Sequence, residues 1–192
     1  MKREIMQQSI ALFVDKGYSA TSIQDIVDAL GVTKGSFYYH YKSKDALLMD
    51  IHQQYIDELL VRQESILQGA APATDKLAAI VRLLIGDMEK QGPIANVYFR
   101  ELRHLKEENA KTIRAKRAEF REQIESVLLE GIESGEFRKE LNPKMTAFAV
   151  LGVTNWSYQW FQPGGELATD ELAQLYTDFI LYGIMPAQSK KP

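Results

Sequence analysis

Residues 17–48 read GYSATSIQDIVDALGVTKGSFYYHYKSKDALL and hold two short helical patterns separated by a glycine. Four apolar residues of the first pattern fall on one helix face, at the spacing i, i+3, i+4, i+7: Ile23, Ile26, Val27 and Leu30. Thr21 and Gln24 have the spacing of a capping box at its start, and Gly31 is expected to end it. Thr33 is expected to cap the second helix. Two short helices joined by a tight, glycine-containing turn form the helix-turn-helix pattern.

Helical patterns continue on both sides of this stretch. Ser43 is expected to cap a fourth helix that reaches about residue 68. The spacing predicts the other helices over residues 3–16, 74–91, 94–105, 109–134, 144–162 and 169–184. We therefore expect an all-α protein of about nine helices. A three-helix helix-turn-helix domain over residues 1–46 precedes a helical domain over residues 47–192.

The composition excludes several kinds of protein. The chain has 192 residues, 45% of them hydrophobic, and no cysteine, which excludes a disulfide scaffold and a thiolate metal site. No apolar run approaches the roughly 20 residues of a membrane-spanning helix, and the first residues lack the pattern of a signal peptide. We expect a cytoplasmic protein without a membrane partner.

Charge is distributed unevenly along the chain. The formal net charge is −3, which taken alone argues against nucleic acid as a partner. Between Gly31 and Lys44, however, the sequence holds three lysines (Lys34, Lys42 and Lys44) and no acidic residue. Distant acidic charge is screened beyond roughly 8–10 Å at working salt, so a local basic face can still bind phosphates.

The second short helix suits the major groove of DNA, which is about 12 Å wide. Gly35 leaves room for a close approach of the backbone, while Ser36 and Tyr38 offer hydroxyl groups. Phe37 and Tyr41 are four residues apart, and we expect both rings to point inward and to anchor the helix on its neighbours.

Residues 17–48 as a whole resemble the N-terminal signature of the TetR family of helix-turn-helix repressors, nearly position by position. The resemblance implies a double-stranded DNA operator as partner. The positions that would approach base edges are Gly35, Tyr38 and His40. The positions that would hold phosphates are Thr21, Ser22, Thr33, Lys34, Ser36, Tyr39 and Lys44.

The aromatic run also has a purely structural interpretation. Tyrosines at a helix end serve packing more often than recognition in an arbitrary protein. The surrounding signature favours recognition for Tyr38 and His40, whereas Tyr41 is expected to pack and Tyr39 fits either role. Lys42 fits a solvated charge.

The C-terminal half carries many aromatic residues. The family resemblance implies that its last two helices pair with those of a second copy in a four-helix bundle, and hence a homodimer. The segments 98–104 and 155–176 resemble family members that respond to acyl-CoA thioesters or other lipid-derived acids. The candidate effector residues are Met88, Tyr98, Arg100, Leu102, Arg103, Phe120, Phe148, Asn155 and Trp156. The apolar members, Phe148 above all, also fit the core of one subunit, and the arginines fit a solvated face.

Other classes of function fit less of the sequence. The three histidines have no metal-motif spacing, although Glu101 and His104 stand three residues apart, as a metal-ligand pair on a helix would. No second such pair and no phosphate-binding glycine loop is visible, so we expect no catalytic residue, metal or cofactor. A helical adaptor would leave residues 17–48 unexplained. A DNA-binding dimer without an effector remains an alternative, and a helical metal-dependent enzyme is a more distant one.

Overall fold

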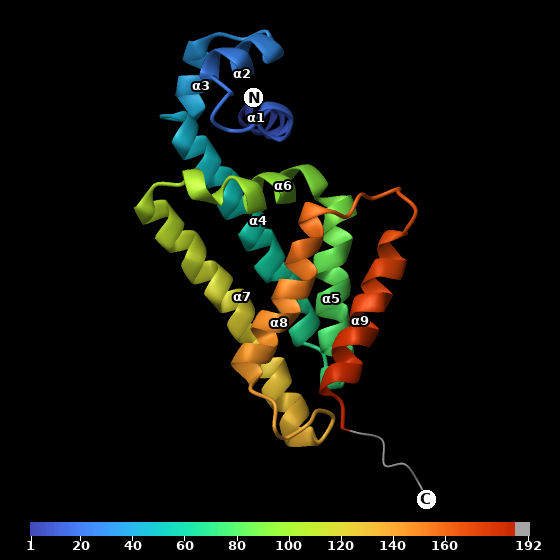
Figure 1. The fold of residues 1–192 in the computed structure, drawn as a ribbon. Coiled ribbons are helices and arrows are strands. Elements are labelled where there is room, and N and C mark those ends of the chain that lie inside the picture. The colour runs from blue at the N-terminus through green and yellow to red at the C-terminus, as the bar shows by residue number, and fades with distance from the viewer. Residues whose placement is uncertain (187–192) are drawn as a thin grey trace, which may run out of the picture. The chain divides into compact units, whose positions relative to one another are not determined.

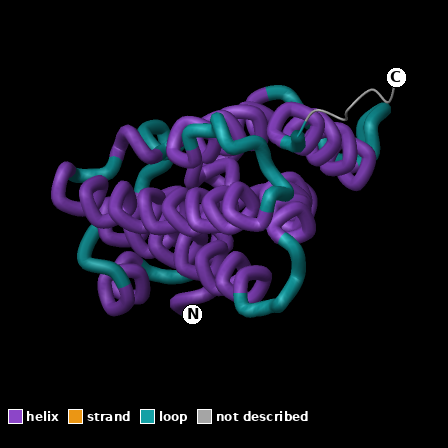
Figure 2. Tube along the Cα trace, turned by 90° about the horizontal axis from the view of Figure 1, so that it is seen from below, coloured by secondary structure: helices purple, strands orange, loops and turns teal. Residues whose placement is uncertain are grey.

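The structure is a computed structural model that describes residues 1–186 of the chain. Within this part the chain forms nine α-helices and two short 3-10 helices, joined by loops and without a strand (Figure 1; Figure 2). The predicted all-α fold is confirmed. None of the described helices is both long and apolar enough to cross a membrane. Residues 187–192, the end of the predicted second domain, lie outside the described residues.

The first of two compact units consists of Met1–Leu59 and Gln91–Lys116. Its elements are α1 (Lys2–Lys16), α2 (Ile23–Leu30), α3 (Lys34–His40), the start of α4 (Lys44–Leu67), α6 (Gly92–Arg100), the 3-10 helix η1 (Leu102–His104) and the start of α7 (Glu107–Ser134). Helix α1 packs against α2 and α6, and α2 packs against α3. Helix α1 turns one apolar face inward, since Met6, Ile10 and Phe13, spaced i, i+4, i+7, are all buried.

The N-terminus of α2 differs from the prediction by one residue. Ser22 is the N-cap, and it forms a complete capping box with Asp25. The predicted pair of Thr21 and Gln24 is therefore wrong. The reason is that the Thr21 hydroxyl turns inward and donates to the carbonyl oxygen of Gly17 at 2.8 Å.

The other caps of this unit agree with the sequence. Gly31 ends α2 with a φ of 66°, a left-handed conformation that favours glycine. Thr33 caps α3 by accepting a hydrogen bond from the Ser36 N–H. Ser43 precedes α4, and its hydroxyl oxygen accepts from the Ala46 N–H at 3.1 Å. Local side-chain chemistry thus sets where these helices begin and end.

The second unit consists of Leu60–Lys90 and the chain from Arg117 onward. Besides the ends of α4 and α7, its elements are α5 (Ala73–Lys90), α8 (Pro143–Trp156), the 3-10 helix η2 (Ser157–Gln159) and α9 (Thr169–Ile184). Helix α5 packs against α8 and α9, and the last two helices run in opposite directions (Figure 1). Its core consists of apolar side chains that are 2% exposed or less, among them Leu77, Ile80, Leu84, Ile124, Leu128, Val150 and Leu172.

A carboxylate caps the first turn of α5. Glu136 accepts hydrogen bonds from the N–H groups of Ala73 at 3.2 Å and of Thr74 at 2.9 Å. The first N–H groups of a helix have no partner within it and favour negative charge. These bonds, with the one from the Thr74 backbone contributing most, hold the pKa of Glu136 below its ordinary value.

Two predicted helices end earlier than expected. The helix predicted over 94–105 is α6 followed by η1, and the helix predicted over 144–162 ends at Trp156 and continues as η2. The backbone tightens there because the Ser157 carbonyl oxygen accepts from the N–H groups of Trp160 and Phe161 at 3.2 and 2.8 Å. One division between the compact units falls within α4, after Leu59. The boundary predicted after residue 46, between a DNA-binding domain and a helical domain, stays a prediction.

Candidate nucleic-acid interface

Helix α3 is anchored to the first unit through one side. Phe37 and Tyr41 are buried, as predicted, with ring centroids 5.9 Å apart. The Tyr41 hydroxyl also donates to Asp50 of α4 at 3.0 Å. The hydroxyl is thereby satisfied while the ring packs, which fixes the rotation of α3 about its own axis.

The opposite side of α3 faces solvent. Tyr38 is 53% exposed and Tyr39 85% exposed, and Lys34 and Gly35 are exposed beside them. His40 is half-buried, and its ring meets that of Tyr39 edge-on at 4.9 Å. The structure therefore exposes Gly35 and Tyr38, two of the three residues predicted to approach base edges, and leaves the third, His40, half-buried at the end of the helix.

Among residues 1–186, no contact excludes a side chain at position 35. A Cβ there would meet Thr33 Oγ1 at 3.5 Å, an ordinary van der Waals contact, and the backbone φ is not in the left-handed region. Gly35 also lies in the first turn of a helix, where glycine is a poor helix former. The predicted close approach of DNA at Gly35 is compatible with this geometry and stays a prediction.

The start of α2 offers a different set of contacts from the one predicted. Ser22 is exposed, but its hydroxyl donates to Asp25 at 2.7 Å, and these hydrogen bonds lower the pKa of that carboxyl group. Thr21 is only 1% exposed, and its hydroxyl is bonded to the backbone of the loop before α2. The side chain of Thr21 cannot reach a phosphate in this structure, so its predicted role is corrected to a structural one.

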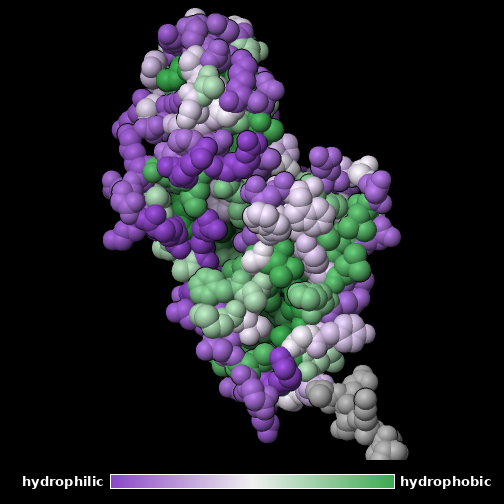
Figure 3. All heavy atoms as spheres, in the orientation of Figure 1, coloured by the Kyte–Doolittle hydropathy of each residue, from purple (hydrophilic) through white to green (hydrophobic). Residues whose placement is uncertain are grey.

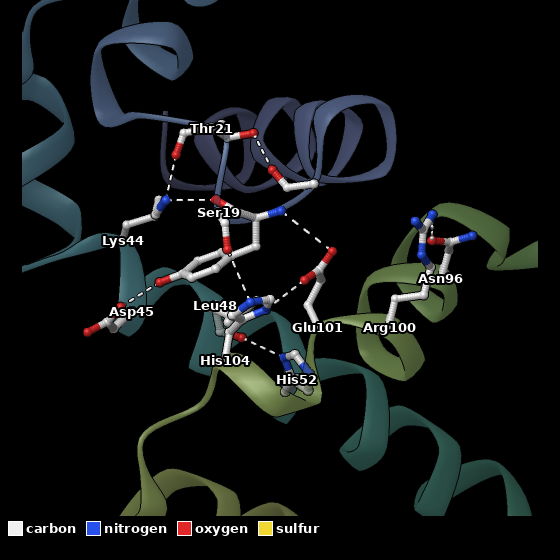
Figure 4. A network of polar contacts seen from close by, with 12 residues as sticks. Ser19, Thr21, Lys44, Asp45, Leu48, His52, Asn96, Arg100, Glu101 and His104 are labelled. Atoms are coloured by element: carbon white, nitrogen blue, oxygen red, sulfur yellow. Dashed lines mark hydrogen bonds and ion pairs between the residues drawn. The ribbon is translucent and has the colours of Figure 1, made fainter.

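Lys44 points into the protein rather than away from it. Its ammonium group donates to the carbonyl oxygens of Tyr18 at 2.7 Å and Thr21 at 2.6 Å, and it lies 4.2 Å from the centre of the Tyr18 ring (Figure 4). Burial lowers the pKa of this ammonium group. Two of its three N–H groups therefore hold the loop between α1 and α2, which differs from the predicted phosphate contact.

Sequence reasoning did not find the polar cluster around Tyr18 (Figure 4). The Tyr18 hydroxyl donates to Asp45, which also pairs with Lys106 at 2.8 Å. Burial, followed by the bond to Asp45, raises the pKa of Tyr18. Glu101 accepts from the Tyr18 N–H at 3.5 Å and lies 2.8 Å from His104 Nδ1. The Glu101–His104 spacing was the only signal of this cluster, and among residues 1–186 no three His, Cys, Asp or Glu side chains converge on a metal position.

Both parts of the chain match known families. Residues 5–51 match the bacterial regulatory proteins of the tetR family, and residues 70–184 match the tetracyclin repressor-like C-terminal domain. The chain belongs to the TetR family. TetR-family proteins bind DNA and regulate transcription, so the chain is a DNA-binding transcriptional regulator, and the adaptor and enzyme alternatives fall away.

Individual relatives cover nearly the whole chain. The HTH-type transcriptional repressor KstR2 of Mycolicibacterium smegmatis is 28% identical over 98% of this chain and 92% of that protein. The structure of the TetR family regulator PfmR from Thermus thermophilus has a TM-score of 0.87 and 31% identity, over 93% of this chain and 97% of that one. AibR in complex with isovaleryl coenzyme A and operator DNA has a TM-score of 0.83 and 27% identity, over 93% of this chain and 96% of that one.

The candidate effector residues of this TetR-family chain are divided between the two units. The first unit holds Tyr98, which is buried and stacks on Tyr55 at 4.6 Å, together with Arg100, Leu102 and Arg103. Arg100 and Arg103 are exposed, and Leu102 is half-buried.

The members in the second unit differ in exposure. Met88 and Phe120 are buried, and Asn155 is half-buried. Phe148 is 49% exposed and Trp156 is 67% exposed, so these two side chains lie on the outer face of α8. Phe148 therefore does not belong to the core of its subunit, which was the alternative interpretation of this residue.

Gln63 is a buried polar residue that sequence reasoning overlooked. It is fully buried in the second unit, and its amide Nε2 donates to the carbonyl oxygen of Phe120 at 3.1 Å. Its Oε1 has no hydrogen-bond partner among the described residues. The available signal was its register, because Gln63 follows Tyr55 and Leu59 at four-residue intervals on the buried face of α4.

Proposed function

We propose that the chain is a homodimeric cytoplasmic repressor that binds a palindromic operator and is released by an acyl thioester or a related lipid-derived acid. The exposed residues of α3 carry the proposal, since Lys34, Gly35 and Tyr38 face solvent and the half-buried His40 lies at the end of the same helix. A helix whose other side is anchored by buried aromatic rings can enter a major groove without any loss of its own packing.

The proposed DNA contacts divide by chemistry. Tyr38 and His40 offer a hydroxyl and a ring nitrogen to base edges, and Gly35 allows a close backbone approach. The groups proposed for phosphates are hydroxyls and an ammonium group, from Ser22, Thr33, Lys34, Ser36 and Tyr39. Ser22 must then give up the hydrogen bond that its hydroxyl donates to Asp25. Lys44 is left out, because its bonds to two carbonyl oxygens stabilise the loop before α2.

The proposed partner of α8 and α9 is a second copy of the chain. Large apolar side chains are exposed on these helices: Met145, Phe148, Trp156, Leu175, Phe179 and Tyr182. The spacing of residues 175, 179 and 182 puts three of them on one face of α9. Hydrophobic surface gathers over this part of the second unit in Figure 3. Monomers rarely expose such a patch, and a two-fold axis would bury it against itself.

An acyl thioester is supported as the effector class by the complex of AibR with isovaleryl coenzyme A and operator DNA. In this chain the buried Met88 and Phe120 supply apolar surface within the second unit. The acceptor oxygen of Gln63 suits a ligand hydroxyl or amide N–H, and coenzyme A carries both kinds of donor. Arg103, which is exposed in the first unit, stays a candidate effector residue predicted from the sequence.

Release from DNA requires a ligand that prefers one conformation over the other. A ligand that binds the DNA-bound and the released conformation equally well leaves the equilibrium between them unchanged, however tightly it binds. The two recognition helices of a dimer must be about 34–36 Å apart to enter successive major grooves on one side of DNA. We propose that the effector favours a dimer with a different spacing.

The proposal is tested with an operator that the purified protein selects from random duplex DNA. Isovaleryl-, octanoyl- and palmitoyl-coenzyme A are titrated against the labelled complex, with free coenzyme A and the free acids as controls. Release by one acyl length, weakened in Arg103→Ala and in Gln63→Leu, is the expected result. Selection of an operator without release by any acyl thioester would reject this effector class and favour a DNA-binding dimer without one. Failure to select any duplex would reject operator binding itself.

A further inference from the structure

Helix α6 and η1 occupy a particular place in the chain. They belong to the first unit, yet they are joined covalently to the second unit on both sides, through Lys90 before α6 and through Arg117 within α7. The segment in turn carries Glu101 and His104, which touch the loop between α1 and α2 (Figure 4).

A continuous chain of hydrogen bonds links the two segments. The Tyr18 N–H donates to Glu101 Oε1 at 3.5 Å, and Glu101 Oε2 lies 2.8 Å from His104 Nδ1. His104 Nε2 lies 3.1 Å from the hydroxyl oxygen of Ser19. Glu101 is only 5% exposed, so its carboxylate depends on these partners in place of water. We call these four residues the Tyr18 latch.

Either protonation state of His104 completes the latch. With a proton on Nδ1, the imidazole donates to Glu101, and its Nε2 either accepts from the Ser19 hydroxyl or, in the charged ring, donates to it. A serine hydroxyl can serve in both senses. The imidazole is therefore a relay between a buried carboxylate and the loop, and its role does not depend on which form is present.

The loop that the latch holds leads directly into the proposed DNA-binding surface. Ser22 follows Ser19 by three residues and caps α2, and the Thr21 N–H is bonded to the Tyr18 carbonyl oxygen at 3.3 Å. From α4, Lys44 holds the same two carbonyl groups of Tyr18 and Thr21. The loop is thus held from two sides, by α4 through Lys44 and by α6 and η1 through Glu101 and His104.

We propose that Glu101 and His104 are positioning residues for operator binding, which hold the loop before α2 in the conformation that presents α2 and α3 to DNA. This inference rests on the proposed operator contacts of α2 and α3. It concerns none of the residues placed against DNA, since the four latch residues act through the loop and not on the ligand.

The experiment compares the parent with Ser19→Ala, with His104→Ala, with the double variant of these two and with Glu101→Gln. Glu108→Gln is the matched control for Glu101→Gln, because Glu108 is an exposed residue of the same unit. Two quantities are measured for each variant. The first is the affinity for the operator that the parent protein selects, and the second is the rate of amide exchange at Tyr18 in the free protein. Ser19→Ala loses one hydrogen bond, worth about 0.5–1.5 kcal/mol, which predicts an operator affinity about 2- to 13-fold weaker. His104→Ala loses two hydrogen bonds, so its affinity should fall at least as far. The double variant should be no weaker than the weaker single variant, because both break one chain of bonds. Glu108→Gln should bind as the parent does.

Amide exchange distinguishes positioning from a general loss of stability. Exchange at Tyr18 should become about 10-fold faster in His104→Ala and Glu101→Gln, while the buried Ile26 amide of α2 keeps the parent rate. Three results would each overturn the latch while leaving operator binding intact. They are parent-like operator affinity in Ser19→Ala and His104→Ala, affinity losses that add fully in the double variant, and amide exchange that accelerates equally at Ile26 and at Tyr18. Should His104→Ala fail to fold, Ser19→Ala and Glu101→Gln still decide the matter. A parent protein that selects no operator would overturn the proposed function and this inference together.

Discussion

Replacement of Gly35 by alanine separates the demands of folding from those of DNA binding. The added Cβ meets only Thr33 Oγ1, at 3.5 Å, so the folded chain accommodates it without rearrangement. Alanine is the better helix former by about 0.8–1.0 kcal/mol in a helix interior, and less is expected in the first turn of α3. Folding alone therefore predicts a slightly more stable protein, whose melting temperature rises by about 2–4 °C at most.

DNA binding should change in the opposite direction. If the backbone of α3 approaches the groove at Gly35, the new methyl group occupies space that the operator needs. Overpacking of one methyl group into a close contact costs about 1–3 kcal/mol, which corresponds to an operator affinity about 5- to 150-fold weaker. A single substitution would thus raise stability and lower affinity.

Fluorescence anisotropy with the selected operator and thermal unfolding of the free protein measure the two effects. Gly86→Ala is the matched control, because it makes the same change within α5 of the second unit, where a Cβ would meet nothing within 4 Å. The control should gain stability and keep parent affinity. Parent-like or tighter operator binding by Gly35→Ala would refute the close approach of α3 to DNA.

Three further predictions concern recognition, assembly and acid stability. Tyr38→Ala and His40→Ala should each weaken the selected operator by about 1–3 kcal/mol relative to unrelated duplexes, measured by competition; equal loss on every sequence would contradict base readout. Phe179 is 68% exposed on α9, and Phe179→Glu should give a monomer in sedimentation at micromolar concentration. Val61 is a similarly exposed apolar residue of α4, and the control Val61→Glu should stay dimeric. A dimeric Phe179→Glu would refute the α8–α9 interface. The pKa of Glu136 is lowered from its ordinary value of 4.5, so its cap on α5 contributes its full stability at pH values above 4.5. This contribution is lost as the pH falls through the lowered pKa. Glu136→Gln should therefore lose less stability than the parent between pH 4.5 and strongly acidic conditions, and parallel unfolding curves would contradict the cap.

Local features of the sequence predicted most of the helices and the recognition surface. Periodic apolar residues and capping side chains act within one or two turns, so Thr33, Ser43 and Gly31 marked helix ends correctly. The capping box failed at Thr21 because two adjacent hydroxyl residues compete for the same role. Only the packing of α1 decides which of them turns inward.

Sequence patterns alone established a helical chain with a helix-turn-helix, because hydrophobic periodicity and capping are short-range properties that a linear reading captures. The family resemblance of residues 17–48 then named the DNA-binding positions. Tertiary structure alone decided the roles of Lys44, Glu101 and His104, because their partners lie 26 and 83–85 residues away in the chain, as in the pairs Lys44–Tyr18 and Glu101–Tyr18. A charged side chain in a basic stretch looks the same in sequence whether it faces phosphate or a backbone carbonyl. Burial and hydrogen-bond geometry distinguish the two, and both arise only when distant segments pack together.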